Sequence, residues 1–232
     1  MSLLPKGGGK SALDIGARDG FISRLLTDHF SMVTALDLEQ PSIDHDRIRC
    51  VKGDITAMHF ADASFNLVFC AEVLEHIPSH FLGTACRELA RVSSDYVLIG
   101  VPYKQDIRVG RTTCSRCGKI NPPWGHVNTF DENRLSELFP EFTAANRSFV
   151  GTSDAQTNVL SCALMDMAGN PYGTYAQEEP CVHCGANLTP PPERRLWQKV
   201  LTKVAFAATT VQKPFTAPHP NWIHLLLRKR TG

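Results

Sequence analysis

A glycine-containing turn near the start of the chain has residue types suited to binding a ligand. The sequence Ala12-Leu-Asp-Ile-Gly-Ala-Arg-Asp-Gly20 begins as an apolar run and leads into the helix-like stretch Phe21-Ile-Ser-Arg-Leu-Leu26. Glycine adopts turn conformations closed to other residues and lets a ligand approach the main chain, and a helix N-terminus offers unpaired N–H groups. The pattern therefore predicts a nucleotide-like cofactor at Gly16 and Gly20, although an ordinary strand-to-helix turn is the plainer interpretation.

Two further observations narrow the expected ligand. Asp37 closes the apolar run 32–36, about 20 residues beyond the turn, where a carboxylate accepts hydrogen bonds from ribose hydroxyls. The dinucleotide pattern G-x-G-x-x-G is absent, and Arg18 stands where a second glycine would bring a pyrophosphate close. We therefore expect a ribose-bearing ligand other than NAD. The stretch Gly7-Gly-Gly-Lys-Ser11 looks like part of a phosphate-binding loop, but it precedes the strand and is interpreted as a flexible leader.

The eight cysteines fall into two classes. Four stand singly in apolar stretches and are interpreted as small buried hydrophobes: Cys50, Cys70, Cys86 and Cys162. The others form two Cys-x-x-Cys-Gly pairs, a spacing that lets both thiolates of a turn face one metal: Cys114, Cys117, Cys181 and Cys184. Four thiolates form a closed set, so the sequence predicts one structural Zn²⁺. Disulfides or redox centres are the alternatives, with His126 and His183 as possible substitute ligands.

Composition limits the remaining possibilities. A chain of 232 residues that is 43% hydrophobic buries one sizeable core with a small appended element. The formal net charge of +1 argues against a nucleic-acid partner. Because neither a secretory signal nor a bilayer-length apolar run is seen, we expect a cytoplasmic protein without a membrane span.

The elements that must position these residues alternate between strand and helix patterns, which is typical of an α/β protein with a parallel sheet. The expected strands are 11–16, 32–37, 48–53, 65–70, 95–101, 142–150 and 221–229. The expected helices follow the turn at residue 21 and cover 81–92, 131–138 and 193–211. The apolar run 157–167 fits either a helix or a strand, and its residue types favour a helix. Residues 1–232 are predicted to form one domain, with a core at 11–103, zinc-binding insert segments at 104–130 and 172–192, and a C-terminal helix and strand at 193–232.

The expected helix 193–211 is open to two interpretations. It is amphipathic, with an apolar side made by Leu196, Trp197, Val200, Leu201, Val204 and Phe206. Its basic residues are Arg194, Arg195, Lys199 and Lys203. Such a helix can lie on a membrane, but we favour a helix whose apolar face packs on the sheet and whose charges are solvated.

Several stretches, taken in order, resemble the class I S-adenosylmethionine-dependent methyltransferases over about residues 11–103. They are LDIGARDG, VTALDLE, VKGDITAMHFADASFNLVFCAEVLEHI and RELARVSSDYVLIGVPY. The resemblance implies a Rossmann-like seven-stranded sheet and methyl transfer from S-adenosylmethionine to a small-molecule acceptor, at oxygen. The EVLEHI stretch is similar to a subgroup that includes ubiquinone-biosynthesis O-methyltransferases.

The same resemblance implies the site residues. The cofactor-binding positions would be Asp14, Gly16, Ala17, Arg18, Gly20, Asp37, Leu38, Asp54, Ile55, Cys70 and Ala71. Of these, Asp37 would bind the ribose and Asp54 the adenine amino group. Two departures from the family pattern stand out: Arg18 replaces a common glycine, and the stretch before residue 11 is too short for the helices that often cover the site.

A general base is needed only if the acceptor is a hydroxyl. His76 is the first candidate because histidine titrates near neutrality, and Glu72 and Glu75 are second choices. An orienting or helix-capping role is the alternative for His76.

Two rival functions share these features. One is an RNA methyltransferase with the zinc knuckles as a recognition module, which the near-neutral charge disfavours. The other is a non-catalytic zinc-binding scaffold, which Asp37 and Asp54 argue against. The acceptor and the oligomeric state are not legible in the sequence.

Overall fold

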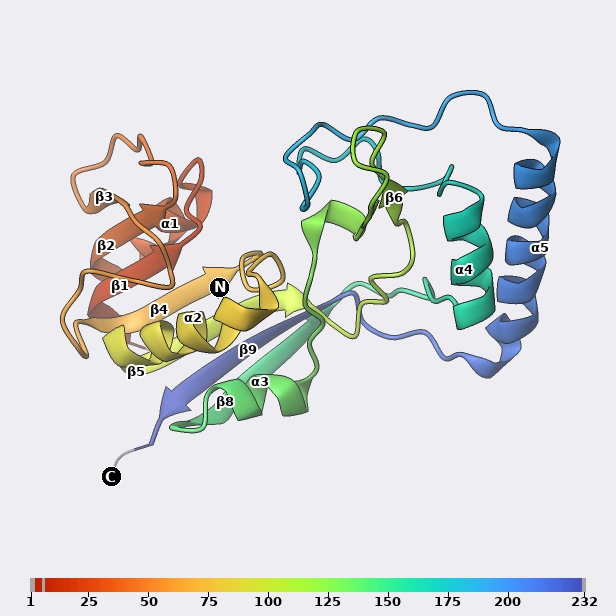
Figure 1. Ribbon diagram of the computed structural model, residues 1–232. Coiled ribbons are helices and arrows are strands. Elements are labelled where there is room, and N and C mark those ends of the chain that lie inside the picture. The colour runs from red at the N-terminus through yellow and green to blue at the C-terminus, as the bar shows by residue number, and fades with distance from the viewer. Residues whose placement is uncertain (1–2, 6, 231–232) are drawn as a thin grey trace. The chain divides into compact units, whose positions relative to one another are not determined.

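The computed structural model describes residues 3–5 and 7–230, and its largest element is a seven-stranded mixed sheet (Figure 1). The strand order is β3-β2-β1-β4-β5-β9-β8. The first five strands in this order pair in parallel, whereas β9 runs antiparallel to both β5 and β8. The strands are β1 (Gly9–Ile15), β2 (Phe30–Asp37), β3 (Ile48–Lys52), β4 (Phe65–Ala71), β5 (Ser93–Pro102), β8 (Phe142–Val150) and β9 (Trp222–Lys229).

Alternating side chains of the central strands build two apolar layers, one on each face of the sheet. Val68 belongs to one layer and its neighbour Leu67 to the other, and both are fully buried. Helices α2 (Ser79–Val92) and α3 (Glu132–Leu138) contribute Leu89 and Leu135 to the first layer. Helix α1 (Phe21–Leu26) contributes Leu26 to the second. Because both faces are covered, the strands read in the sequence as nearly continuous apolar runs.

The structure confirms the predicted elements to within a few residues, including β8 at residues 142–150 and a helix at 159–167. The predicted cap of α3 is also present, since the Asp131 carboxylate accepts a hydrogen bond from the Arg134 N–H at 2.9 Å. The interpretation of Gly7–Ser11 as a flexible leader is wrong for its last three residues. Gly9 begins β1, and the Lys10 N–H donates to Asn66 Oδ1 at 3.0 Å, so cross-strand hydrogen bonds fix this segment despite its glycines.

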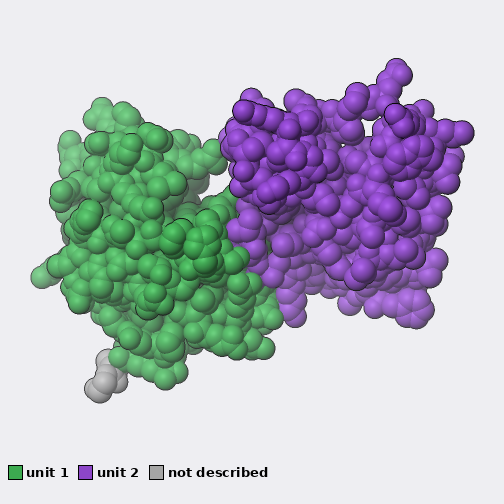
Figure 2. Space-filling view, viewed as in Figure 1, with its two compact units in different colours: residues 1–103, 130–151, 221–232 green, residues 104–129, 152–220 purple. Residues whose placement is uncertain are grey.

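The chain divides into two compact units (Figure 2). Unit 1 comprises the described parts of residues 1–103, 130–151 and 221–232, and holds the whole seven-stranded sheet. Unit 2 comprises residues 104–129 and 152–220, so it contains most of the first and all of the second predicted zinc segment. The predicted C-terminal piece 193–232 is shared, because its helix belongs to unit 2 and its strand to unit 1.

Unit 2 is built from short elements and one helix pair. They are β6 (Thr112–Thr113), β7 (Ile120–Asn121), the 3₁₀ turns η1 (Pro123–Gly125) and η2 (Lys213–Phe215), and the helices α4 (Val159–Met167) and α5 (Leu196–Gln212). Helix α5 packs on α4.

The expectation that the apolar side of α5 packs inward is wrong. Of the six apolar residues predicted for that side, only Leu201 is partly covered and the other five are exposed. The residues that meet α4 are small or polar, as described below. Among the described residues, no helix combines the length and apolar character needed to cross a bilayer.

Candidate functional site

The predicted cofactor residues of unit 1 gather at the carboxyl ends of three neighbouring strands. Strand β1 lies between β2 and β4, and Ile15, its last residue, pairs with Leu36 of β2 and Cys70 of β4. The residues that follow these pairs, Gly16, Asp37 and Ala71, therefore lie side by side at one edge. In open α/β sheets this edge, where the strand order reverses, is where ligands bind.

The glycine turn has the backbone conformation that its residues require. Gly16 and Gly20 have φ of 74° and 79°, in the left-handed region that glycine favours. A Cβ on Gly16 would come within 2.6 Å of the Val73 side chain, and one on Gly20 within 2.3 Å of Ile43. The positive φ and these close approaches together disfavour any other residue at both positions, whatever the ligand.

Arg18 shares the left-handed conformation without being glycine, with φ of 45°. Left-handed backbone in such a residue stores about 1–3 kcal/mol of strain. The turn is held by the N–H groups of Gly16 and Ala17, which both donate to the Leu36 carbonyl at 2.9 and 3.2 Å. The Arg18 N–H donates to Asp37 Oδ2 at 2.9 Å, so this strained residue ties the turn to the predicted ribose-binding carboxylate.

Asp14 is buried inside β1, with 2% of the residue exposed. Its Oδ2 accepts a hydrogen bond from Ser23 Oγ at 2.5 Å, which joins β1 to α1 across the glycine turn. Burial raises the pKa of Asp14 to about 6, against the lowering effect of the Ser23 hydrogen bond. Ser23 was not predicted as a site residue, since serine in a first helical turn has no distinctive sequence signal.

The loop after β3 carries the predicted adenine contacts. Asp54 Oδ1 accepts hydrogen bonds from both the N–H and the hydroxyl of Thr56 at 2.7 Å, and the neighbouring Ile55 is buried. Leu38, the residue after Asp37, is exposed. Leu38 therefore lies at the same edge as the turn, one strand further from β4, and Asp54 and Ile55 lie two strands further.

Arg91 of α2 holds that loop in place and was missed by sequence reasoning. Its guanidinium donates to the carbonyls of Met58 and Phe60 at 2.9 and 2.7 Å. The same group pairs with Glu88 and Asp62 at 2.7 and 2.8 Å. Glu88 Oε2 also accepts the Met58 N–H at 2.9 Å, so two side chains of one helix fix the backbone that follows Asp54.

The EVLEHI stretch follows β4 directly. Cys70 is fully buried and Ala71 partly so, and burial raises the pKa of the Cys70 thiol well above its usual range, which makes it an apolar packing group. Glu72 has φ of 58° and is the second left-handed residue other than glycine at this edge after Arg18, and its N–H donates to the Gly100 carbonyl at 3.0 Å. Desolvation raises the pKa of Glu72 to about 7, although the residue remains exposed and water screens part of that effect.

Glu75 and His76 differ in exposure. Glu75 is completely buried, and among the described residues neither of its carboxylate oxygens has a hydrogen-bond partner. Burial raises the pKa of this carboxyl to about 8. His76 is partly exposed, and its N–H donates to the Val73 carbonyl at 3.0 Å. Of the three base candidates, Glu75 is therefore the one whose burial withholds it from an acceptor.

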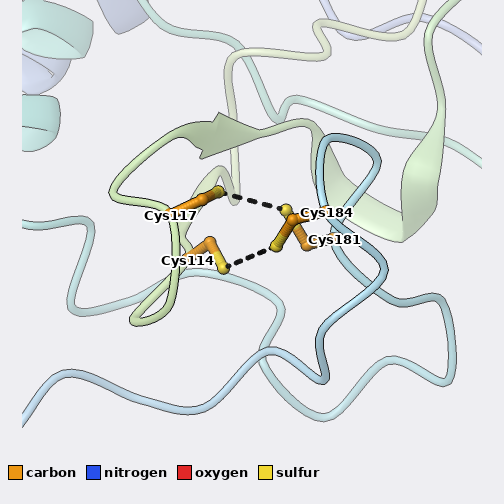
Figure 3. Close-up of side chains that lie close together, drawn as sticks. All are labelled: Cys114, Cys117, Cys181 and Cys184. Carbon is orange, nitrogen blue, oxygen red and sulfur yellow. Dashed lines mark hydrogen bonds between the residues drawn. The ribbon is translucent and has the colours of Figure 1, made fainter.

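In unit 2 the four paired cysteines point toward one another (Figure 3). Their sulfurs all lie within 4.8 Å of each other, with Cys114 and Cys184 3.8 Å apart and Cys117 and Cys181 3.7 Å apart. No disulfide joins them, since all eight cysteines are free and each lies among the described residues. The histidines predicted as substitutes have other partners: His183 Nε2 lies 3.0 Å from the Ile120 carbonyl, and His126 Nδ1 lies 2.7 Å from Gln105 Oε1.

The two cysteine pairs have the same local structure. The N–H of Gly118 donates to the Cys114 carbonyl at 2.9 Å, and the N–H of Gly185 donates to the Cys181 carbonyl at 2.8 Å. Both glycines are left-handed, with φ of 69° and 67°. Backbone hydrogen bonds from the N–H groups of Cys117 and Arg116 lower the pKa of Cys114. Two turns whose nearest cysteines, Cys117 and Cys181, are 64 positions apart in the sequence thus present matching thiol pairs.

Two of the separations between the sulfurs fit tetrahedral coordination of one metal ion. Ligands about 2.3 Å from a central Zn²⁺ at tetrahedral angles lie about 3.8 Å from one another. The two measured separations agree with that value. The set is closed, because four protein ligands leave no coordination position for a substrate.

Comparisons with known proteins agree with this fold. The family model described as a methyltransferase domain matches residues 13–95. A ubiquinone biosynthesis O-methyltransferase of Idiomarina loihiensis is 32% identical over 80 residues, which are 30% of this chain and 33% of that protein. The match thus spans about a third of the length of the curated relative.

Solved structures resemble the chain over nearly its whole length. A 1,6-didemethyltoxoflavin-N1-methyltransferase of Burkholderia thailandensis, with S-adenosylhomocysteine bound, is 16% identical with a TM-score of 0.54 and covers 97% of this chain and 73% of its own. The [4+2]-cyclase SpnF is also 16% identical, with a TM-score of 0.55, and covers 98% of this chain and 77% of its own. At such identities these structures show the fold alone. The chain therefore has the α/β fold of the class I methyltransferases, and its residues 13–95 match the model of a methyltransferase domain.

Proposed function

We propose that the protein transfers a methyl group from S-adenosylmethionine to an oxygen atom of a small-molecule acceptor. The observation that carries the proposal is the arrangement of Gly16, Asp37 and Glu72 after three adjacent parallel strands. The bound cofactor would supply an activated methyl group on a sulfonium, so the protein has mainly to align donor and acceptor. Support comes from the match of residues 13–95 and from the relative named for O-methylation.

The residues at the edge would divide the work. Asp37 uses Oδ2 for the Arg18 N–H, which fixes its carboxylate, and we assign Oδ1 to the ribose hydroxyls. Asp54 and Ile55 would contact the adenine, and Leu38 would cover one side of the adenosine. Asp14, Ala17, Gly16 and Gly20 would shape the turn around the amino-acid part, and Cys70 and Ala71 would pack beside the methionine chain.

We assign proton removal from the acceptor hydroxyl to His76, with Glu72 as its alternative. Both follow β4 and retain exposure to solvent. A neutral imidazole or an ionised carboxylate accepts the proton as the methyl group leaves for oxygen. His76→Asn and Glu72→Gln should separate the roles, since only loss of the true base removes the acidic limb of the pH profile of methyl transfer.

Titration calorimetry with S-adenosylhomocysteine tests the proposal. The zinc-loaded chain should bind, and Asp37→Ala should weaken binding by about tenfold to a hundredfold, because hydrogen bonds to a charged group are lost. Asp28→Ala, an exposed carboxylate outside the strand edge, is the matched control and should bind normally. Absence of binding by folded wild-type protein overturns the proposal. A screen of acceptors by transfer of labelled methyl then identifies the substrate.

We further propose that the four cysteines of unit 2 hold one structural Zn²⁺. The support is the tetrahedral spacing of the sulfurs and the matching turns that present them. Reduced thiols of this kind belong to a reducing compartment, which agrees with a cytoplasmic location. Elemental analysis should find one zinc per chain and none in Cys181→Ser, whereas Cys50→Ser should keep it. Replacement by Co²⁺ should give thiolate-to-cobalt charge-transfer bands in the wild type, and zinc retained by Cys181→Ser contradicts the site.

A further inference from the structure

Helix α5 carries an exposed apolar stripe, defined as Leu196, Trp197, Val200, Val204 and Val211. These residues recur at helical spacing and so share one side of the helix. Leu196 is 79% exposed and Val211 is 72% exposed, and the other three are near half. Phe215, in the η2 turn that follows directly, is 86% exposed. Contiguous apolar exposure of this kind marks an interaction surface, whereas single exposed apolar residues do not.

The opposite side of α5 is the one that packs on α4, so the stripe is not the packing face of the helix. Thr202 and Ala205 are the buried residues of the helix. Ser161 Oγ of α4 lies 2.8 Å from the Ala205 carbonyl and 2.6 Å from Thr209 Oγ1. The seam with α4 is therefore made of small and hydroxyl side chains, while the large apolar ones point away from it. This is the reverse of the usual surface helix.

The charges around the stripe have one sign. Residues 194–220 include five basic residues and no acidic one, although the whole chain has nearly equal numbers of each. Lys199 and Lys203 lie on α5 beside the stripe, and both are exposed. An apolar stripe flanked by lysines is the pattern of a helix that lies in the interface of an anionic bilayer.

We propose that this face of α5 binds the surface of an anionic membrane. The stripe and Phe215 enter the boundary between headgroups and acyl chains, and Lys199 and Lys203 contact the lipid phosphates. A second copy of the chain fits the surface less well, because two such faces would bring Lys199 and Lys203 of both copies, four like charges, together. The binding is peripheral and stands independently of the proposed methyl transfer.

Vesicle flotation with the zinc-loaded 232-residue chain tests the inference. The protein should float with phosphatidylcholine vesicles that contain phosphatidylglycerol, and much less with phosphatidylcholine alone. Val200→Gln with Val204→Gln should reduce the bound fraction on the order of tenfold, whereas Met32→Gln, equally exposed on β2, should not. Lys199→Glu with Lys203→Glu should remove the preference for anionic lipid, and Lys52→Glu, on β3, is its control.

The emission of Trp197 supplies a second readout. In a variant with Trp124→Phe and Trp222→Phe, emission should shift to the blue with anionic vesicles and stay unchanged in buffer. Flotation of the double valine variant at the wild-type level overturns the proposal. A dimer seen by light scattering in buffer, with Trp197 already shifted to the blue, also overturns it in favour of self-association.

Discussion

Different interactions stabilise the interior of each of the two units of this chain. Unit 1 has two extensive layers of buried apolar residues, one on each face of its sheet. The apolar cluster at the cysteine site of unit 2 has three buried members, Cys114, Cys181 and Leu188, and two of these are proposed metal ligands. Its helix pair meets through small and polar side chains. Hydrophobic burial accounts for the stability of unit 1. For unit 2, we propose that the bound Zn²⁺ compensates for the small apolar cluster.

Removal of zinc should therefore affect the two units unequally, and this is the largest effect we expect. Structural Zn²⁺ contributes about 10 kcal/mol or more in small zinc domains. After chelation, amides of residues 114–118 and 181–185 should lose protection from hydrogen exchange, while those of β4 keep theirs. Simultaneous loss of protection in both units contradicts this contrast, and a parallel measurement on Cys50→Ser controls for cysteine loss outside the site.

The same contrast explains what the sequence could and could not predict. The strands of unit 1 were legible because a sheet covered on both faces leaves long apolar runs, and the zinc turns because their spacing is local. The start of β1 could not be predicted from its glycines, because its structure depends on hydrogen bonds that its N–H groups donate to distant residues such as Asn66. Periodicity indicated that α5 has an apolar side. It did not indicate that this side faces outward, because tertiary contacts decide which side of α5 packs on α4.

Some residues of the candidate site could not be predicted because their roles depend on long-range contacts. Nothing in the local sequence separates Arg91 from a solvated helix residue, yet it binds carbonyls 31 and 33 positions away. The motif identified the neighbours Glu75 and His76 as candidate bases. It did not predict that Glu75 is buried. Which side chain of a motif faces inward depends on the layer beneath it.

The buried carboxyl of Glu75, in the stretch that follows β4, should affect how stability depends on pH. The pKa of Glu75 is raised from 4.5 to about 8 by burial. Between these values the unfolded chain releases a proton that the folded chain retains, so stability falls as pH rises, by about 1.4 kcal/mol per pH unit. Below the lower value both states are protonated and the effect vanishes.

Glu75→Gln should abolish this slope and stabilise the protein by about 3 kcal/mol at pH 7. Denaturant unfolding at a series of pH values measures both quantities. Glu137→Gln, an exposed carboxylate on α3, should leave the slope as it is in the wild type. An unchanged slope in Glu75→Gln shows that the carboxyl is ionised in the folded state.

A smaller effect is expected from Arg91, which we propose positions the loop that contains Asp54. Arg91→Lys keeps a positive charge but loses the planar fork that reaches Glu88 and two carbonyls together. We expect a loss of about 2 kcal/mol in unfolding free energy and weaker binding of S-adenosylhomocysteine, because the loop with Asp54 is released. Arg87→Lys on the same helix, whose guanidinium reaches Thr84 Oγ1, should change neither. Normal cofactor affinity in Arg91→Lys removes the positioning role.

The smallest expected effect concerns the strained turn itself. Arg18 and Ala63 both have left-handed backbone, with φ of 45° and 53°, but only Arg18 belongs to the candidate cofactor turn. Glycine relieves the strain at either position and adds freedom to the unfolded chain, so each variant should gain at most about 1 kcal/mol, or about 2–4 °C in Tm. The Arg18 N–H that binds Asp37 survives in Arg18→Gly.

If strain at residue 18 serves only to complete the turn, both variants gain stability alike and bind S-adenosylhomocysteine as the wild type does. If the strain instead fixes the Asp37 carboxylate for the ribose, Arg18→Gly alone weakens binding while its stability rises. Calorimetry and thermal unfolding on the same two variants distinguish these outcomes, and a loss of stability in Arg18→Gly contradicts the assignment of strain.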